Sequence, residues 1–124
     1  MYVRIITPHI QDKKIVFVMT RSHYKRLMNA GVKIYEFEPG FVHAKVYLSD
    51  DKYGIVGTIN LDYRSLVHHF ENGVWLYQHE VLDEIKEDMQ ATMSQSIRIE
   101  DATIKDTLLQ RFIRAVVRAL SPML

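Results

Sequence analysis

The chain has 124 residues, enough for one domain, and 48% of them are hydrophobic, so it can form a packed core. It contains no cysteine, which excludes disulfides and cysteine-ligated metal sites. The formal net charge of +1 argues neither for nor against a polyanionic partner, and no apolar run reaches the ~18 residues that a membrane-spanning helix needs.

In chain order, the sequence predicts strands that alternate with helices. The expected elements are a strand at residues 2–7, a helix at 23–30, strands at 32–37, 42–48, 53–58 and 73–77, and helices at 80–92 and 103–120. Residues 15–19 are apolar and fit a short buried helix or a strand equally well. Ser22 is typical of a helix N-cap, and Gly31 of the residue just past a helix end. The strand at residues 73–77 carries the only tryptophan and is predicted to be buried.

This order of elements indicates an α/β domain whose mixed sheet is covered by helices. We expect residues 1–102 to form this domain. Residues 103–124 are expected to contain an amphipathic helix, with a broad apolar face and basic residues away from its centre. Such a helix fits two places about equally well: packed on its own domain, or at an anionic membrane surface.

One stretch, residues 43–60, gathers side chains that suit a catalytic site. In a strand at residues 42–48, alternate side chains share a face, so His43, Lys45 and Tyr47 point to one side. The apolar residues between them point to the other side and can pack into a core. An imidazole and an ammonium group are therefore expected to be neighbours on one surface.

The second strand of this stretch ends at Gly57, where a missing side chain lets a backbone or a bound group approach closely. Thr58 and Asn60 follow as neutral hydrogen-bond donors. Near pH 7 the neutral imidazole of His43 can attack phosphorus, and Lys45 supplies positive charge for phosphate oxygens. The pattern therefore favours phosphoryl transfer to histidine, and it requires no metal.

A second pair of this kind, His23 and Lys25, is predicted to be solvated. The two residues fall on the predicted helix, where positions two apart point away from each other, and Ala30 stands where the first pattern has Asp50. Arg21, just before this helix, could reach an anionic ligand, although the sequence does not single it out.

The chain resembles the phospholipase D superfamily at every fixed position of its HKD motif. The matching residues are His43, Lys45, Asp50, Gly57, Thr58 and Asn60. The flanks at residues 33–42 and 61–65, with Phe70 and Glu71, resemble bacterial cardiolipin synthases. The resemblance implies a phospholipase D-like α-β-α sandwich with a mixed sheet, of which this chain is one HKD half-domain, the C-terminal one.

The resemblance also implies roles for the matching residues. His43 corresponds to one of two active-site histidines, and Lys45, Thr58 and Asn60 correspond to residues that hold the phosphate. Asp50 corresponds to the motif's aspartate, which usually supports the site through hydrogen bonds. We therefore assign His43, Lys45 and Asp50 to the catalytic set. We assign Thr58 and Asn60 to substrate binding.

Residues beyond the motif complete the implied site. Glu71 matches an acidic residue that orients the imidazole, since a carboxylate can fix a histidine tautomer. His68 and His69 stand where many members have Leu-Asn. This leaves open whether His69 touches a ligand, and a structural role is favoured because histidine is commonly half-buried.

The function implied by the resemblance is that of the C-terminal catalytic half of a cardiolipin synthase. It would transfer a phosphatidyl group between two phosphatidylglycerols through a phosphohistidine, release glycerol and use no cofactor. The implied partners are phosphatidylglycerol, an anionic membrane surface, and either a missing N-terminal HKD half or a second copy of the chain. The implied location is the cytoplasmic side of a bacterial cell membrane.

Two alternatives differ in class. A homodimeric phospholipase D-like nuclease or phosphodiesterase is disfavoured by the flanks and by the lack of a broad basic surface, so no nucleic acid is expected as a partner. A non-catalytic half-domain used only for assembly is disfavoured by the complete motif.

Overall fold

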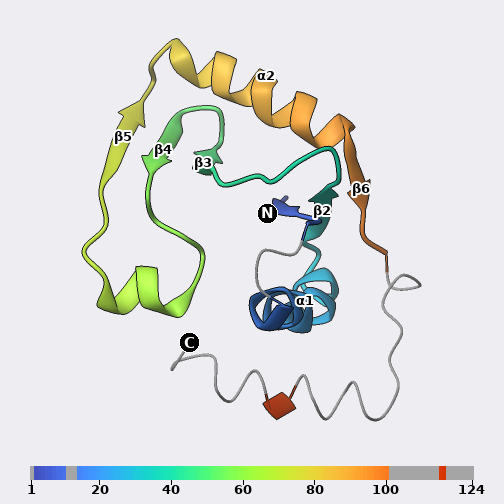
Figure 1. Cartoon of the computed structure of the whole chain (residues 1–124). Coiled ribbons are helices and arrows are strands. Elements are labelled where there is room, and N and C mark those ends of the chain that lie inside the picture. Colours follow the sequence, from blue (N-terminus) through green and yellow to red (C-terminus); the bar gives the residue numbers. More distant parts are fainter. Residues whose placement is uncertain (1, 11–13, 101–114, 117–124) are drawn as a thin grey trace. The chain divides into compact units, whose positions relative to one another are not determined.

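The computed structural model describes residues 2–10, 14–100 and 115–116, and the chain divides into two compact units (Figure 1). The first unit comprises Met1–Val42 and Gln95–Leu124, and the second comprises His43–Ser94. Among the described residues, each unit holds one three-stranded sheet.

The first unit contains a mixed sheet with the strand order β1-β2-β6. Strand β1 (Arg4–Pro8) pairs in parallel with β2 (Lys33–Phe37), and β2 pairs antiparallel with β6 (Ser96–Arg98). Helix α1 (Lys14–Asn29) connects the two parallel strands, because parallel neighbours need a crossover connection. This arrangement confirms the predicted mixed sheet and its first two predicted strands.

Helix α1 is longer than the helix predicted from the sequence. It includes the apolar residues 15–19, and the predicted N-cap at Ser22 is wrong. The Ser22 hydroxyl donates to the carbonyl oxygen of Met19 at 2.6 Å, so it bonds back within the helix and does not cap it. Gly31 is confirmed as the residue past the helix end, since its φ is +87° and its N–H donates to the carbonyl of Met28 at 2.9 Å.

The apolar core of the first unit forms where α1 meets β2. Its buried members are Tyr24 of α1, Ile34 of β2 and Ile99, which follows β6. The main chain joins the last two, since the N–H of Ile99 donates to the carbonyl of Ile34 at 2.9 Å. Partly buried side chains pack against this core at Leu27, Met28 and Val32.

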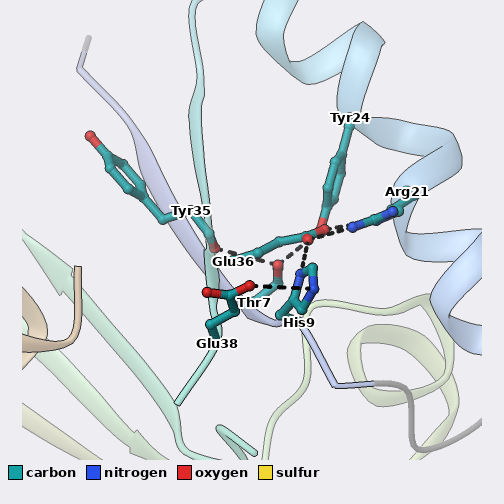
Figure 2. Close-up of polar contacts among 7 residues, drawn as sticks. All are labelled: Thr7, His9, Arg21, Tyr24, Tyr35, Glu36 and Glu38. Carbon is teal, nitrogen blue, oxygen red and sulfur yellow. Dashed lines mark hydrogen bonds and ion pairs between the residues drawn. The ribbon is translucent and has the colours of Figure 1, made fainter. Parts of the chain in front are cut away.

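One charged residue, Glu36, is fully buried on the central strand β2. Arg21 donates to both of its carboxylate oxygens, at 2.9 and 2.6 Å, and His9 Nδ1 lies 2.8 Å from Oε2 (Figure 2). The Tyr24 hydroxyl, itself 2.8 Å from the hydroxyl of Thr7, completes the network. Burial raises the pKa of Glu36, but hydrogen bonds from Arg21 and His9 outweigh it, so the pKa lies below its usual value. The anion that Arg21 reaches in this structure is therefore the protein's own carboxylate.

The second unit contains an antiparallel sheet, a short π-helix and an α-helix. In chain order its elements are β3 (Lys45–Ser49), β4 (Tyr53–Gly57), η1 (Arg64–His68), β5 (Gly73–Tyr77) and α2 (Val81–Ser94). The strand order is β3-β4-β5, and both pairings are antiparallel. A tight turn joins β3 to β4: Asp50 and Asp51 have φ values of 52° and 55°, and the N–H of Lys52 donates to the carbonyl of Ser49 at 3.1 Å. Positive φ at both central positions is the hairpin geometry that matches strand twist.

Two predictions for this sheet need correction. Strand β3 begins at Lys45, so His43 precedes the strand and does not lie within it. Strand β5 is confirmed, but its predicted burial is wrong, since Trp75 is 64% exposed and Tyr77 is 55% exposed. Among the described strands, β5 pairs with β4 alone, and its two aromatic rings lie against the ring of Tyr53, with centroids 6.0 and 5.1 Å away, in place of a core.

The opposite face of the antiparallel sheet packs against the start of α2. Leu82 is buried there, and a Cβ atom added to Gly54 of β4 would lie 2.6 Å from its side chain. This close packing places the first turn of α2 over β4. Helix α2 confirms the helix predicted at residues 80–92.

The remaining fold predictions are tested only in part. The predicted helix at residues 103–120 lies outside the described residues, apart from Ala115 and Val116, and the domain boundary at residue 102 stays a prediction. Within the part of the chain that the structure describes, no helix is long and apolar enough to cross a membrane. The two sheets establish a mixed α/β fold, while their assembly into one α-β-α sandwich stays a prediction.

Candidate active site

The antiparallel sheet of the second unit brings most of the predicted site residues to one of its ends. In the strand register, Lys45 lies opposite Gly57, and Gly57 lies opposite Gly73. The start of β3, the end of β4 and the start of β5 therefore meet there. Because neighbouring strands lie about 4.8 Å apart, side chains from all three strands can reach one bound group.

His43 and Lys45 occupy this end of the sheet on the β3 side. His43 is exposed and lies two residues before Lys45, the half-buried first residue of the strand. The Lys45 ammonium donates to the carbonyl oxygen of His43 at 2.6 Å. An ammonium group has three donors, so two N–H groups remain beyond this contact for a bound anion.

Gly57, at the end of β4, has no room for a side chain. A Cβ atom there would overlap the carbonyl oxygen of Asn72 and would lie 2.6 Å from the Cα of Gly73. The backbone just before β5 therefore packs directly on Gly57, which confirms the predicted close approach. The pairing continues one residue further, where the N–H of Thr58 donates to the carbonyl of Asn72 at 2.8 Å.

Thr58 and Glu71 are joined through their side chains. The Thr58 hydroxyl donates to Glu71 Oε2 at 2.5 Å and accepts the N–H of Asn72 at 3.0 Å. Hydrogen bonds from the hydroxyls of Thr58 and Ser65 lower the pKa of the Glu71 carboxyl. Glu71 is therefore ionised near neutral pH and holds the Thr58 hydroxyl in place.

The second carboxylate oxygen of Glu71 faces a histidine outside the motif. His69 Nδ1 lies 3.7 Å from Glu71 Oε1, within ion-pair distance. The sequence assigns Glu71 to the imidazole of His43, and that orientation stays a prediction. The structure adds His69 to the set of side chains around this carboxylate.

Asn60 lies in the loop that follows β4. Its amide Nδ2 donates to the hydroxyl of Ser65 at 3.3 Å, and the buried Ser65 donates its own N–H to Asp62 Oδ1 at 2.7 Å. These contacts tie Asn60 to the first turn of η1. The sequence did not predict a role for Ser65, and the one local signal is Asp62, since an aspartate just before a helical turn can accept a backbone N–H two or three residues on.

Tyr47 is a second residue at the site for which the sequence predicted no role. Its hydroxyl donates to the carbonyl oxygen of Ile59 at 2.9 Å, between the two predicted substrate-binding residues. This contact holds the loop after β4 against β3. The only sequence signal for it is the strand alternation that places Tyr47 on the same face as Lys45.

Asp50 is not brought together with the other motif residues. It lies in the turn at the far end of β3, about 17 Å from Lys45 at the usual rise of a strand, and accepts a hydrogen bond from the Ser49 hydroxyl at 3.3 Å. This position fits support of the turn, so we assign Asp50 no step in the chemistry below.

His23 and Lys25, the second pair noted in the sequence, lie on α1 in the first unit. Lys25 is exposed, as predicted, whereas His23 is half-buried. Both residues belong to the first unit, whereas the residues of the HKD motif belong to the second.

Comparison with known proteins shows the family of this chain. Residues 1–93 match the model of the family described as "Cardiolipin synthase, PLD-like domain". The chain is 49% identical over 123 residues to an uncharacterized protein of Streptococcus mutans. The aligned region covers 98% of this chain and 27% of that protein. It is 37% identical over 123 residues to cardiolipin synthase 2 of Bacillus anthracis and to a cardiolipin synthase of a Geobacillus species, with 98% of this chain and 24% of each relative covered. The chain thus spans about a quarter of the length of the curated relatives that it matches. It belongs to the family of cardiolipin synthase PLD-like domains.

Proposed function

We propose that this chain supplies one half of the active site of a cardiolipin synthase, which joins two phosphatidylglycerol molecules and releases glycerol. The observation that carries the proposal is one end of the antiparallel sheet: Lys45 lies opposite Gly57 there, His43 lies two residues before Lys45, and Thr58, directly after Gly57, is hydrogen-bonded to Glu71. Family membership, and relatives that are named cardiolipin synthase, support the class of substrate.

The reaction proceeds in two displacements at one phosphorus atom. In the first, a histidine nitrogen bonds to phosphorus, the bond from phosphorus to the terminal glycerol oxygen breaks, and a second histidine gives that oxygen a proton. In the second, a hydroxyl of the other phosphatidylglycerol attacks phosphorus, the phosphorus–nitrogen bond breaks, and the second histidine takes up the hydroxyl proton. His43 is one of these two histidines, and acid–base help of this kind contributes ~10²–10⁴-fold.

Two neighbouring side chains, Lys45 and Asn60, have donors for the negatively charged phosphate oxygens. Lys45 offers the two N–H groups that its contact with the His43 carbonyl leaves over. Asn60, on the loop that leaves β4, keeps one amide N–H beyond its contact with Ser65, whereas the one hydroxyl proton of Thr58 is donated to Glu71. Donors that are already held in place stabilise developing charge better than mobile ones do.

The chemistry needs two imidazoles on opposite sides of one phosphorus, and the motif occurs once in this sequence. We propose that the second imidazole comes from another HKD half or from a second copy of the chain. Because the substrates are lipids, the assembled site would work at a membrane surface.

A chimera tests the proposal. This chain replaces the matching quarter of cardiolipin synthase 2 of Bacillus anthracis, and cardiolipin formation from phosphatidylglycerol is measured by lipid mass spectrometry. We expect turnover by the chimera, a loss of at least ~10²-fold with His43→Ala, and full retention with the control substitution His23→Ala. Cardiolipin formation by a folded His43→Ala chimera above about 1% of the unsubstituted level would contradict the assignment.

A further inference from the structure

His69 is a second imidazole at the end of the sheet where the proposed phosphate site lies. It follows η1 directly, and its N–H donates to the carbonyl of Arg64 at 2.8 Å, which closes the π-helical turn. Its side chain is 47% exposed, so one edge of the ring is open to a ligand. The turn therefore fixes the backbone of His69 while leaving its imidazole accessible.

The carboxylate of Glu71 links this imidazole to the motif. One oxygen accepts the Thr58 hydroxyl at 2.5 Å, and the other lies 3.7 Å from His69 Nδ1. Because hydrogen bonds from Thr58 and Ser65 lower the pKa of Glu71, the carboxylate stays charged and favours a proton on the facing nitrogen, Nδ1. The other ring nitrogen, Nε2, lies on the ring edge that does not face Glu71 and is then the one available to a ligand.

The neighbouring histidine is held differently. The ring of His68 lies edge-on to the ring of Tyr63, with centroids 5.3 Å apart. This aromatic contact gives His68 a packing role on η1. The two adjacent histidines thus form a matched pair, one beside the Glu71 carboxylate and one against an aromatic ring.

We propose that His69 binds the substrate phosphate through Nε2–H when its ring is protonated, beside Lys45 and Thr58. The inference rests on the proposed function and adds a phosphate ligand outside the motif. A protonated imidazole donates from both ring nitrogens, so His69 can face the Glu71 carboxylate with Nδ1–H and a phosphate oxygen with Nε2–H. Glu71 faces the ring across the ion pair, and Asp62, Arg64 and His68 are the other titratable or charged groups of the same segment.

Binding of dimethyl phosphate to the 124-residue chain, followed by NMR, tests this inference. A phosphodiester keeps one negative charge across the range used, so any pH dependence arises from the protein. All variants carry His43→Asn, because this substitution removes the other imidazole of the site. We expect affinity about tenfold higher near pH 5.5 than near pH 8 in this background, since charged hydrogen bonds are strong ones. Addition of His69→Asn should abolish the difference, while addition of His68→Asn should preserve it.

Each outcome decides a separate point. Equal pH dependence with and without His69→Asn overturns the inference, as does a lack of measurable binding at either pH. If Lys45→Ala weakens binding while His69→Asn does not, His69 only accompanies Glu71 and the proposed function stands. If Lys45→Ala also leaves binding unchanged, the phosphate site itself fails, and the proposed function fails with it. Amide spectra of every variant confirm that the fold is retained.

Discussion

Removal of Arg21 should destabilise the first unit strongly. Arg21→Met keeps much of the side-chain volume but removes both guanidinium hydrogen bonds to the fully buried carboxylate of Glu36. His9 is then the remaining side chain beside this carboxylate that can carry a positive charge. Breaking a buried ion pair by removal of one partner costs about 3–5 kcal/mol. The Arg21 side chain is 39% exposed, so water can partly replace it, and we expect a loss near the lower end, about 3 kcal/mol.

Urea unfolding followed by circular dichroism at pH 7 measures this loss. The matched control is Glu38→Gln, because the Glu38 carboxylate is 56% exposed and lies 3.9 Å from His9 Nε2, an arrangement that contributes at most about 1 kcal/mol. The double variant Arg21→Met/Glu36→Leu should recover most of the stability, since it leaves no buried charge unpaired. A loss below about 1 kcal/mol for Arg21→Met alone would refute the reasoning.

The same carboxylate predicts a dependence of stability on pH. The folded-state pKa of Glu36 lies below its unfolded value of about 4.3, so the group stabilises the fold fully above that value. Its contribution is then lost as the pH falls through the folded-state pKa. Glu36→Gln should therefore reduce the loss of unfolding free energy as the pH falls below about 4. An unchanged loss in this variant would mean that other carboxyl groups cause the acid destabilisation.

Three further predictions concern the second unit, the reaction and the C-terminal segment. Gly57→Ala should destabilise the chain by about 1–3 kcal/mol, because its new Cβ meets backbone atoms that cannot move aside, whereas Gly54→Ala meets the movable tip of Leu82 and should cost less. Fluorescence of Trp75 during urea unfolding measures both, and equal losses would contradict the difference. Cardiolipin formation by the chimera should survive EDTA, since the site offers donors and a lysine but no cage of carboxylates; loss restored by a divalent ion would overturn this. Deletion of residues 103–124 should reduce co-flotation with phosphatidylglycerol vesicles, and equal flotation would remove the membrane role of this segment.

The sequence predicted those elements whose signals are local. Gly31 ends α1 because a left-handed residue is needed there, and alternating apolar residues marked the strands that the structure confirms. The predicted N-cap at Ser22 was wrong because a serine hydroxyl can bond a backbone group either at a helix cap or within a helix. The apolar residues before Ser22 extend the helix, so its hydroxyl bonds within it.

Features that depend on distant partners were the ones that sequence reasoning missed. A glutamate in a short strand is normally expected at the surface. The burial of Glu36 is favourable only because Arg21 and His9, from other segments of the chain, contact its carboxylate. Trp75 reads as buried because it is large and apolar, yet its exposure depends on what covers β5.

The candidate site shows the same division. The motif spacing predicted that His43 and Lys45 share a face of one strand, whereas in the structure His43 precedes β3. Pairing of Lys45 with Gly57, and the hydrogen bond from Thr58 to Glu71, place these residues at the same end of the sheet. The spacing could not show that Asp50 lies in a turn at the far end of the strand, since that follows from where β3 ends.

The most direct test of the central claim is an activity measurement on the isolated chain together with its mass in solution. Because only one HKD set is present, the account predicts no cardiolipin formation from phosphatidylglycerol by the monomer. Turnover should appear when the complementary portion of a cardiolipin synthase is added, or in a fraction whose mass corresponds to two copies. Robust turnover by a strict monomer would mean that both histidines of the reaction lie within these 124 residues, and would contradict the half-site account.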